Sequence, residues 1–317
     1  MLYSFLVAGF GLVVLLLSGD FLLRGAISVS NKLGISKLII GLTVVAFGTS
    51  APELLISIRA VLDGVSGLAI GNVVGSNIAN ILLVIGLPAS VAGLPLVGTE
   101  TQKPYLIMIA SSILFISVSF FGVINLTSGL ILFFGFVFVF TYTVVTASKK
   151  TLTPSMNIDE TRHDPNTKTI IAIFLILLGL VGLPLGTNLF VDSAIAISQG
   201  FGVSEALIGL TLVAVGTSLP ELATMIVATF RRETDLAIGN IIGSNVFNLL
   251  AIMGISSFFG NINVPTEFLK FDLWCMLFSS LLLAPMIFGW YGISRIGGVL
   301  LVLLYAFYLS FVVSAGM

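Results

Sequence analysis

Long apolar runs separated by short polar connections extend over the whole chain. A helix needs about 20 mostly apolar residues to cross a bilayer, and dividing the chain at its polar, glycine and proline interruptions predicts ten spanning helices. Their predicted extents are 2–30, 36–61, 67–92, 104–121, 125–148, 169–199, 204–230, 236–258, 269–290 and 294–314. The pattern therefore predicts an all-α polytopic membrane protein with ten transmembrane helices.

Two pairs of matching segments reveal an internal repeat. One match joins IIGLTVVAFGTSAPEL (39–54) to LIGLTLVAVGTSLPEL (207–222). The other joins LAIGNVVGSNIANILLVIG (68–86) to LAIGNIIGSNVFNLLAIMG (236–254). The offset is the same in both cases, since 207 − 39 and 236 − 68 each give 168. A single duplication explains both matches.

The duplication divides the chain into two repeats of five predicted spans each. We assign 1–148 to the first repeat, with its motif at 39–86, and 169–317 to the second, with its motif at 207–254. The polar segment 149–168 is interpreted as a linker. Because five is odd, the second repeat enters the membrane inverted relative to the first. Inverted repeats with helices interrupted at matching positions are typical of transporters whose substrate site lies near the midplane.

The distribution of Lys and Arg predicts the orientation, because these residues favour cytoplasmic connections. With the N-terminus outside, the outer connections hold little beyond Arg59 and Lys270. The inner connections then hold Lys32, Lys37, Lys103, Lys149, Lys150, Arg162, Lys168, Arg231, Arg232 and Arg295. We therefore expect a multi-pass protein of the inner membrane with both termini outside and the linker in the cytoplasm. The N-terminal run lacks the positive region of a signal peptide, so we expect it to be a retained span.

Composition agrees with a membrane protein and excludes several functions. The chain is 57% hydrophobic and 9% charged, with a mean hydropathy of +1.18, whereas about a quarter of the residues of a soluble domain are charged. The net charge of −1, without a basic face, gives no indication of nucleic-acid binding. Cys275 is the single cysteine, so an intrachain disulfide is excluded and we expect a small buried hydrophobe.

Other polar residues suggest no chemistry of their own. His163, the only histidine, lies in the linker, where we expect it to be solvated. For Asp20 and its repeat equivalent Asn188, near helix ends, we expect an interfacial or hydrogen-bonding role. An intramembrane hydrolase would need a Ser/His dyad, paired Asp residues or metal-binding His residues within the spans. We therefore expect no enzymatic activity and no cofactor.

The second predicted span contains a proline followed by a carboxylate. Pro52 has no N–H to bond the carbonyl of Gly48, so backbone oxygens at that turn are freed. In hydrocarbon they must face protein, water or an ion. Glu53 follows directly, and Pro220 and Glu221 repeat the pair. A charge at mid-membrane costs at least about 2.5 to 3.5 kcal/mol, so two symmetric carboxylates indicate ion binding rather than simple kinks.

The partner motifs add neutral oxygens at a spacing of four residues, which places them on one helix face. These residues are Asn72, Ser76 and Asn80 in the first repeat and Asn240, Ser244 and Asn248 in the second. Glycine pairs, Gly71 with Gly75 and Gly239 with Gly243, let another helix approach closely. Such stripes often serve packing alone. Together with two acids they form a hard, oxygen-rich set suited to Ca²⁺, which takes six to eight oxygens, and to Na⁺. Competition of the two ions for shared carboxylates is a physical basis for exchange.

These motifs resemble the two alpha repeats of the Ca²⁺/cation antiporter superfamily, in particular of its prokaryotic sodium/calcium exchangers. The resemblance is carried by GTSAPE and GNVVGSNIAN in the first repeat and by GTSLPE and GNIIGSNVFN in the second, and it covers nearly the whole chain. It implies antiport of Na⁺ against Ca²⁺ by alternating access, in which helices 2–30 and 169–199 slide across a fixed core. It also implies a compact fold that functions as a monomer in the lipid bilayer.

The resemblance implies which residues bind each ion. Ca²⁺ would be bound by Glu53, Glu221 and the backbone carbonyls of Thr49 and Thr217. One flanking Na⁺ site would use Ser50, Ser244, Glu53 and the Ala46 carbonyl, and its symmetry mate would use Ser218, Ser76, Glu221 and the Ala214 carbonyl. Asn80 and Asn248 would complete a middle site.

Two departures from related patterns concern the coupling ion. Archaeal and K⁺-dependent relatives have an acid where Asn248 stands, so the resemblance argues against K⁺ dependence. Proton-coupled relatives carry an acid shortly after the Gly-Asn of the second motif, where this chain has Ser76 and Ser244 after glycine, which favours Na⁺. Proton coupling stays open as the alternative, as does another divalent cargo such as Mn²⁺. A channel is disfavoured, because paired helix breaks in inverted repeats are typical of alternating access.

Overall fold

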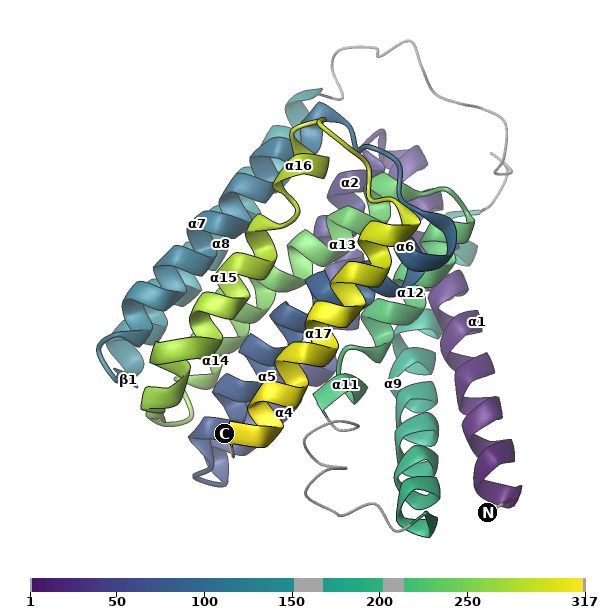
Figure 1. Ribbon diagram of the computed structural model, residues 1–317. Coiled ribbons are helices and arrows are strands. Elements are labelled where there is room, and N and C mark those ends of the chain that lie inside the picture. Colours follow the sequence, from purple (N-terminus) through teal and green to yellow (C-terminus); the bar gives the residue numbers. More distant parts are fainter. Residues whose placement is uncertain (1, 151–167, 202–213, 316–317) are drawn as a thin grey trace.

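The computed structural model describes residues 2–150, 168–201 and 214–315, which are almost entirely helical (Figure 1). Its long uninterrupted helices are α1 (Leu2–Leu33), α7 (Gln102–Ser119), α8 (Leu126–Lys150), α9 (Thr169–Gly200) and α17 (Arg295–Ala315). Most of the predicted linker, including His163, falls on 151–167, outside the described residues.

Other spans are built from consecutive helical segments. The first repeat has α2 (Lys37–Ile40), η1 (Gly41–Val45), α3 (Ala46–Thr49) and α4 (Ala51–Leu62), followed by α5 (Ser66–Ala79), η2 (Asn80–Ile85) and α6 (Gly86–Ala92). The second has α11 (Ala214–Gly216), α12 (Leu219–Phe230), α13 (Thr234–Val246), η5 (Phe247–Ile252) and α14 (Met253–Ser256), followed by η6 (Phe268–Asp272), α15 (Leu273–Leu281) and α16 (Ala284–Ile287). The turn η3 (Thr99–Thr101) precedes α7, and the short strands β1 (Val123–Ile124) and β2 (Ile262–Asn263) pair antiparallel.

The observed helices agree with the predicted spans to within a few residues. The described residues contain eight helices long and apolar enough to cross a membrane, and a ninth if the bent pair Lys37–Thr49 and Ala51–Leu62 forms one span. The remaining predicted span, 204–230, falls partly on 202–213, outside the described residues, and α12 is its described apolar part. The prediction of a helical polytopic protein is confirmed, while the ten-span inverted-repeat count stays a prediction.

The predicted break in the second span lies at Ser50, where the helix axis bends by 45°. Ser50 has φ −91° and ψ 8°, and its repeat equivalent Ser218 has φ −86° and ψ 6°. The cause is the proline two residues later, whose ring and missing N–H end one helix and suit the first turn of the next. Both repeats are therefore broken at the same position.

The span that follows each broken helix contains a π-helical turn. The turn η2 begins at Asn80, and η5 begins one residue before Asn248. A π-helical turn inside an α-helix occurs frequently at functional sites. Each turn coincides with a residue of the predicted middle site.

Helices α1 and α9 lie side by side and antiparallel at one edge of the bundle (Figure 1). Glycines bring their backbones into contact. A Cβ on Gly25 would lie 2.7 Å from the carbonyl oxygen of Ala172, and one on Gly179 would lie 2.8 Å from that of Ser18. Small residues permit such close approach within a membrane. The pair contacts the rest of the described protein mainly through α12.

Asp20 on α1 joins this pair to the core. It accepts hydrogen bonds from Nε of Arg24 at 2.7 Å and from Nε of Arg231, which follows α12, at 2.6 Å. Asp20 therefore has the hydrogen-bonding role expected from the sequence. Its repeat equivalent Asn188 lies exposed on α9, so the two repeats differ here.

Helix α13 lies at the centre of the bundle, and its span Thr234–Ser256 is buried along its apolar window. A Cβ on Gly239 would lie 2.4 Å from the carbonyl oxygen of Leu38, and one on Gly243 would lie 2.5 Å from that of Leu42. The predicted close approach is confirmed for this glycine pair. The equivalent partners of Gly71 and Gly75 would be residues 206 and 210 by the 168-residue offset, and these lie outside the described residues.

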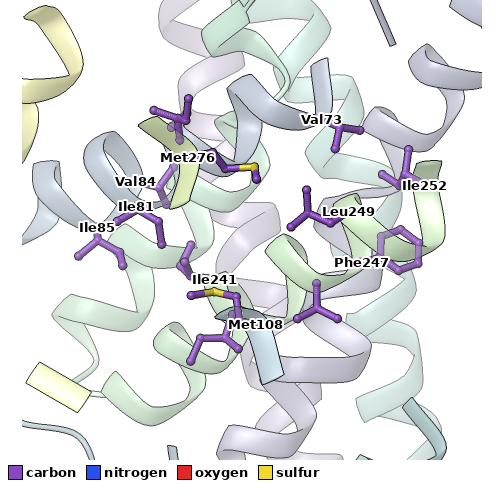
Figure 2. Packing of buried hydrophobic residues seen from close by; sticks show 14 of the residues in the cluster. Val73, Ile81, Val84, Ile85, Met108, Ile241, Phe247, Leu249, Ile252 and Met276 are labelled. Atoms are coloured by element: carbon purple, nitrogen blue, oxygen red, sulfur yellow. The ribbon is translucent and has the colours of Figure 1, made fainter. Parts of the chain in front are cut away.

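Side chains around α13 form a continuous apolar core in which Ile241, Leu249, Met108 and Met276 are buried (Figure 2). Cys275, adjacent to Met276 on α15, is only partly buried. It packs against the core as the expected hydrophobic residue, but its burial is partial because it lies at the edge of the core.

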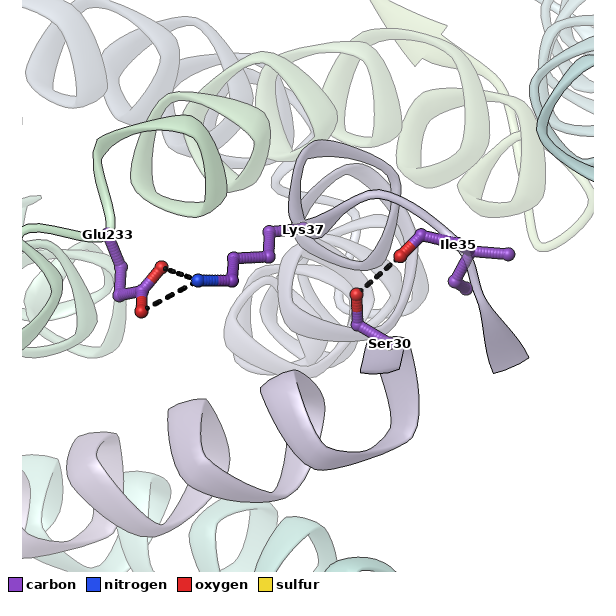
Figure 3. Close-up of polar contacts among 4 residues, drawn as sticks. All are labelled: Ser30, Ile35, Lys37 and Glu233. Atoms are coloured by element: carbon purple, nitrogen blue, oxygen red, sulfur yellow. Dashed lines mark hydrogen bonds and ion pairs between the residues drawn. The ribbon is translucent and has the colours of Figure 1, made fainter. Parts of the chain in front are cut away.

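Polar contacts hold the start of α2 (Figure 3). Lys37 Nζ donates to both carboxylate oxygens of Glu233, at 3.0 Å and 2.8 Å, and so joins α2 to the turn between α12 and α13. Ser30 Oγ donates to the carbonyl oxygen of Ile35 at 2.6 Å across the turn that follows α1. The Lys37–Glu233 pair therefore attaches the start of α2 to the second repeat.

Candidate functional site

The site is built around two carboxylates, Glu53 and Glu221, neither of which is exposed (0% each). Each lies in the first turn of a helix that restarts after a break, Glu53 in α4 and Glu221 in α12. Unpaired N–H groups and the helix dipole favour negative charge at such a position. Ser50, at the break just before Glu53, donates a hydrogen bond to Glu221. The helix breaks therefore place two acids together inside the bundle.

Hydroxyl groups surround Glu221. Its Oε1 accepts hydrogen bonds from Ser50 Oγ at 2.9 Å and from Ser244 Oγ at 3.5 Å. Ser50 belongs to the first repeat and Glu221 to the second, so this contact crosses between repeats. Ser50 therefore contacts the acid of the facing repeat as well as standing three residues before Glu53, and the predicted Na⁺ site of Ser50, Ser244, Glu53 and the Ala46 carbonyl stays a prediction.

The two repeats contact each other in the same way on both sides of the site. Thr49 Oγ1 lies 3.4 Å from Ser244 Oγ, and Ser76 Oγ lies 3.3 Å from Thr217 Oγ1, each pair sharing a hydrogen bond. These pairs are equivalent under the 168-residue offset. Thr49 Oγ1 also donates to Asn240 Oδ1 at 3.3 Å. The motif with the acid in one repeat therefore faces the asparagine-rich motif of the other.

Asn72 and Asn240 form hydrogen bonds to the helices that follow the breaks. Asn72 Nδ2 donates to the carbonyl oxygen of Glu53 at 3.0 Å and to Ser57 Oγ at 2.9 Å. Asn240 Nδ2 donates to Thr224 Oγ1 at 3.1 Å. These amides therefore stabilise the helices that carry the acids.

Asn80 and Asn248, the residues predicted for a middle site, are fully buried (0% exposed each). Asn80 Nδ2 donates to Asn245 Oδ1 at 3.0 Å, and Asn248 Nδ2 donates to Asn77 Oδ1 at 3.1 Å. Asn77 and Asn245 were missed by the sequence reasoning, because they lie off the four-residue stripe. The signal that would have found them is their equivalence under the 168-residue offset.

Several buried oxygens at the site have no hydrogen-bond partner within the described residues. They are both oxygens of Glu53, Oε2 of Glu221, Oγ of Ser218 and the Oδ1 atoms of Asn80 and Asn248. A buried polar group without a partner costs about 1 to 3 kcal/mol, and more if charged. Apart from the serine hydroxyl, these atoms can only accept. A bound cation would satisfy them together.

The donor set is that of a hard-cation site. No cluster of three or more His, Cys, Asp or Glu is present among the described residues, so a cation here would rely on two carboxylates and neutral oxygens. Ca²⁺ accepts carboxylate, amide and carbonyl oxygens in flexible geometry. The chemistry of the residues present therefore fits Ca²⁺ or Na⁺.

The backbone oxygens predicted as ligands lie beside the breaks. The Ala46 carbonyl accepts a hydrogen bond from the Ser50 N–H at 3.1 Å and one from Thr49 Oγ1 at 3.4 Å. Ala214 begins α11, the short helix before Thr217 and Ser218. Both alanines therefore lie one turn before a break.

Comparison with known proteins gives a consistent result. The family model described as sodium/calcium exchanger protein matches residues 3–146 and 171–314. The putative antiporter CaxA of Alkalimonas amylolytica is 40% identical over 78% of this chain and 78% of its own length. The sodium/calcium exchanger MaX1 of Methanosarcina acetivorans is 32% identical over 96% of this chain and 97% of its own length.

A solved structure has the same fold over almost the whole chain. The structure of the sodium-calcium exchanger NCX_Mj soaked with Na⁺ and Sr²⁺ superposes with a TM-score of 0.82 at 30% identity, covering 97% of each chain. Further structures of the same exchanger, soaked with other concentrations of Na⁺, Ca²⁺ or Sr²⁺, give TM-scores of 0.81 to 0.82.

Proposed function

Because the chain belongs to the sodium/calcium exchanger family, and is thus an integral membrane protein of the cation/Ca²⁺ antiporters, we propose that it exchanges Na⁺ for Ca²⁺ by alternating access. The observation that carries the proposal is the buried pair Glu53 and Glu221, three of whose four carboxylate oxygens have no partner among the described residues. Two negative charges match one Ca²⁺ or two Na⁺. The site therefore suits replacement of one cargo by the other.

In the proposed Ca²⁺-bound state, Glu53 and Glu221 bind the ion together with the carbonyls of Thr49 and Thr217. Two bidentate carboxylates and two carbonyls supply six oxygens, the lower end of the usual Ca²⁺ coordination number. Pairing of the ion with both acids offsets the cost of burying them. The same carboxylates are then unavailable to Na⁺.

In the proposed Na⁺-bound state, the flanking sites are formed by residues of both repeats. One site is formed by Ser50, Ser244, Glu53 and the Ala46 carbonyl, and the proximity of Ser50 and Ser244, which both contact Glu221, supports it. Its symmetry mate is formed by Ser218, Ser76, Glu221 and the Ala214 carbonyl. Asn80 and Asn248 border the middle site. Exchange follows because Na⁺ and Ca²⁺ compete for the same two acids.

The proposed architecture has ten spans in two inverted repeats, 1–148 and 169–317, with the linker in the cytoplasm. Both termini lie on the outer side of the inner membrane. The protein functions as a monomer. The antiparallel packing of α1 and α9, the first helices of the two repeats, supports the inverted arrangement. So do the equivalent breaks at Ser50 and Ser218.

The decisive experiment is ⁴⁵Ca²⁺ uptake into proteoliposomes preloaded with Na⁺. The outside bath contains Na⁺, K⁺ or choline, and a protonophore is present. We expect uptake only with an outward Na⁺ gradient, and we expect it to survive the protonophore. Uptake that ignores Na⁺ and follows an imposed pH gradient would establish proton-coupled exchange instead. The Na⁺ roles of Ser50, Ser76, Ser218 and Ser244 would then be withdrawn.

We also expect Ca²⁺ to stabilise the purified protein. A ligand at a concentration of 100 times its Kd stabilises the folded state by about 2.7 kcal/mol. The Tm in detergent should therefore rise on adding Ca²⁺ and fall on chelation. Mg²⁺, which demands small octahedral geometry and dehydrates reluctantly, should give a smaller shift. An equal shift with Mg²⁺ would contradict a Ca²⁺-selective site.

A further inference from the structure

We infer that Asn77 and Asn245 are positioning residues that orient the side-chain oxygens of Asn80 and Asn248 toward the bound cation, with Met108 and Met276 fixing the direction of each amide. The inference rests on the proposed function, since it concerns the middle of the same site. It adds a second layer of residues behind the ligands, and none of these four residues faces the ion itself.

One relay runs from a methionine to the first-repeat ligand. Asn245 Nδ2 donates to Met108 Sδ at 3.7 Å, and Asn245 Oδ1 accepts from Asn80 Nδ2 at 3.0 Å. The Oδ1 of Asn80 has no partner among the described residues. The three side chains are at most 1% exposed. The relay therefore ends in a buried acceptor that is free for a cation.

The second relay repeats the first with the repeats exchanged. Asn77 Nδ2 donates to Met276 Sδ at 3.8 Å and to the carbonyl oxygen of Asn245 at 3.3 Å, and Asn77 Oδ1 accepts from Asn248 Nδ2 at 3.1 Å. The Oδ1 of Asn248 likewise has no described partner. Every member obeys the offset, since 245 − 77, 248 − 80 and 276 − 108 each give 168. The duplication has therefore kept the whole relay.

The thioethers give each relay its direction. An amide carries a donor end and an acceptor end of nearly equal shape, whereas a thioether sulfur accepts hydrogen bonds and cannot donate. The amide nitrogen of Asn245 must therefore face Met108, and its oxygen must face Asn80. Asn80 can then meet that oxygen only with its own nitrogen. Its remaining oxygen is left for the ion.

The reverse orientation would harm ion binding. If the Asn80 amide turned over, its NH₂ group would point its partial positive charge at the cation. Met108 and Met276 lie among apolar side chains (Figure 2). A serine or glutamine in their place could also accept a hydrogen bond from the asparagine amide, but it could donate one as well and so would not fix the direction of the amide. A sulfur acceptor therefore combines apolar packing with a fixed hydrogen-bond direction.

The test uses Asn245→Leu and Asn77→Leu, which remove the acceptor behind each ligand. In proteoliposomes we expect the KM for ⁴⁵Ca²⁺ to rise about tenfold, as for loss of one oriented hydrogen-bonded group, with kcat changed less than about twofold. The variant Ser119→Ala is the control, because it removes a buried hydroxyl that bonds only within its own helix. Its KM should equal that of the wild type.

A double-mutant cycle separates positioning from a structural role. In an Asn80→Ala background the oriented oxygen is already gone, so adding Asn245→Leu should change the KM less than about twofold. Full additivity of the two KM effects would overturn the inference. So would a lowered kcat or Tm with an unchanged KM, which is the signature of a purely structural role.

Met108→Leu and Met276→Leu keep the inference testable if the asparagine variants do not fold. Leucine has about the same volume as methionine, and cores tolerate such volume-conserving substitutions well. The substitution removes the weak sulfur acceptor. We expect a KM increase of about two- to threefold for each, because the lost hydrogen bond is weak. An unchanged KM in both would overturn the role given to sulfur.

Failure of this inference is distinguishable from failure of the proposed function. The shift of Tm caused by Ca²⁺ alone measures binding without any coupling ion. A wild-type protein that binds Ca²⁺ but uses protons leaves the relay testable by the same variants. A wild-type protein that binds no Ca²⁺ overturns the proposed function before any variant is made.

Discussion

Replacing Glu221 by Gln is expected to abolish Na⁺-driven ⁴⁵Ca²⁺ uptake while the protein stays folded. The substitution keeps size and shape but reduces the charge of the site from −2 to −1. Two opposite charges about 4 Å apart attract by about 4 kcal/mol at an effective dielectric constant of 20, and each 1.4 kcal/mol corresponds to a factor of ten. A loss of at least about 100-fold in kcat/KM is therefore expected.

The fold should tolerate the change because Glu221 contributes little to packing through its charge. An ionised carboxylate in the interior of a membrane protein is costly unless paired, so the neutral amide should leave the Tm in Ca²⁺-free buffer unchanged or higher. The stabilisation by Ca²⁺ should disappear. Glu53→Gln should behave in the same way, since Glu53 has two unpartnered oxygens within the described residues.

Glu233→Gln provides a matched control outside the site. Glu233 pairs with Lys37; their side chains are 12% and 41% exposed, and glutamine keeps an oxygen that can accept from the Lys37 ammonium. Exchange by this variant should therefore match the wild type, with at most a small fall in Tm. Full Ca²⁺ transport by both Glu53→Gln and Glu221→Gln would refute the site assignment.

The spans and the helix breaks could be predicted from sequence because they depend on local chemistry. Twenty apolar residues in a row have few alternatives to a membrane helix, and a proline weakens the helix that precedes it, although α9 continues through Pro184. The break at Ser50 follows from Pro52 alone. The duplication then transfers each local conclusion to the second repeat, as the nearly identical backbone angles of Ser218 show.

Which side chain faces which partner could not be predicted, because that depends on how the repeats meet. Ser50 stands three residues before Glu53, yet its hydroxyl donates to Glu221 at 2.9 Å. Spacing along one helix says nothing about a partner that the other repeat supplies. Asn77 and Asn245 were not predicted as site residues for a related reason. Their partners are on the opposite repeat, and the spacing of polar residues along one helix does not tell which residues of the other repeat they contact.

Helix α13 supplies the second prediction with a large effect, because it lies against the backbone of η1. Gly243→Ala is expected to lower the stability by about 2 kcal/mol or more, in the upper part of the usual range for an overpacked core. The added Cβ would lie 2.5 Å from the carbonyl oxygen of Leu42 and 2.7 Å from the Cβ of Ala46. Neither is the end of a flexible side chain, so α13 itself must move away.

Movement of α13 should also weaken ion binding. It would separate Ser244 from Thr49, now 3.4 Å apart between their hydroxyl oxygens. We therefore expect a raised KM for Ca²⁺ together with a lowered Tm in detergent. Gly135→Ala is the matched control, since a Cβ there would lie 3.5 Å from the nearest atom, the Cδ2 of Leu114. That change should stabilise α8 slightly, as alanine is the better helix former. If Gly243→Ala instead keeps the wild-type Tm and KM, the close packing of α13 on η1 does not set the geometry of the site.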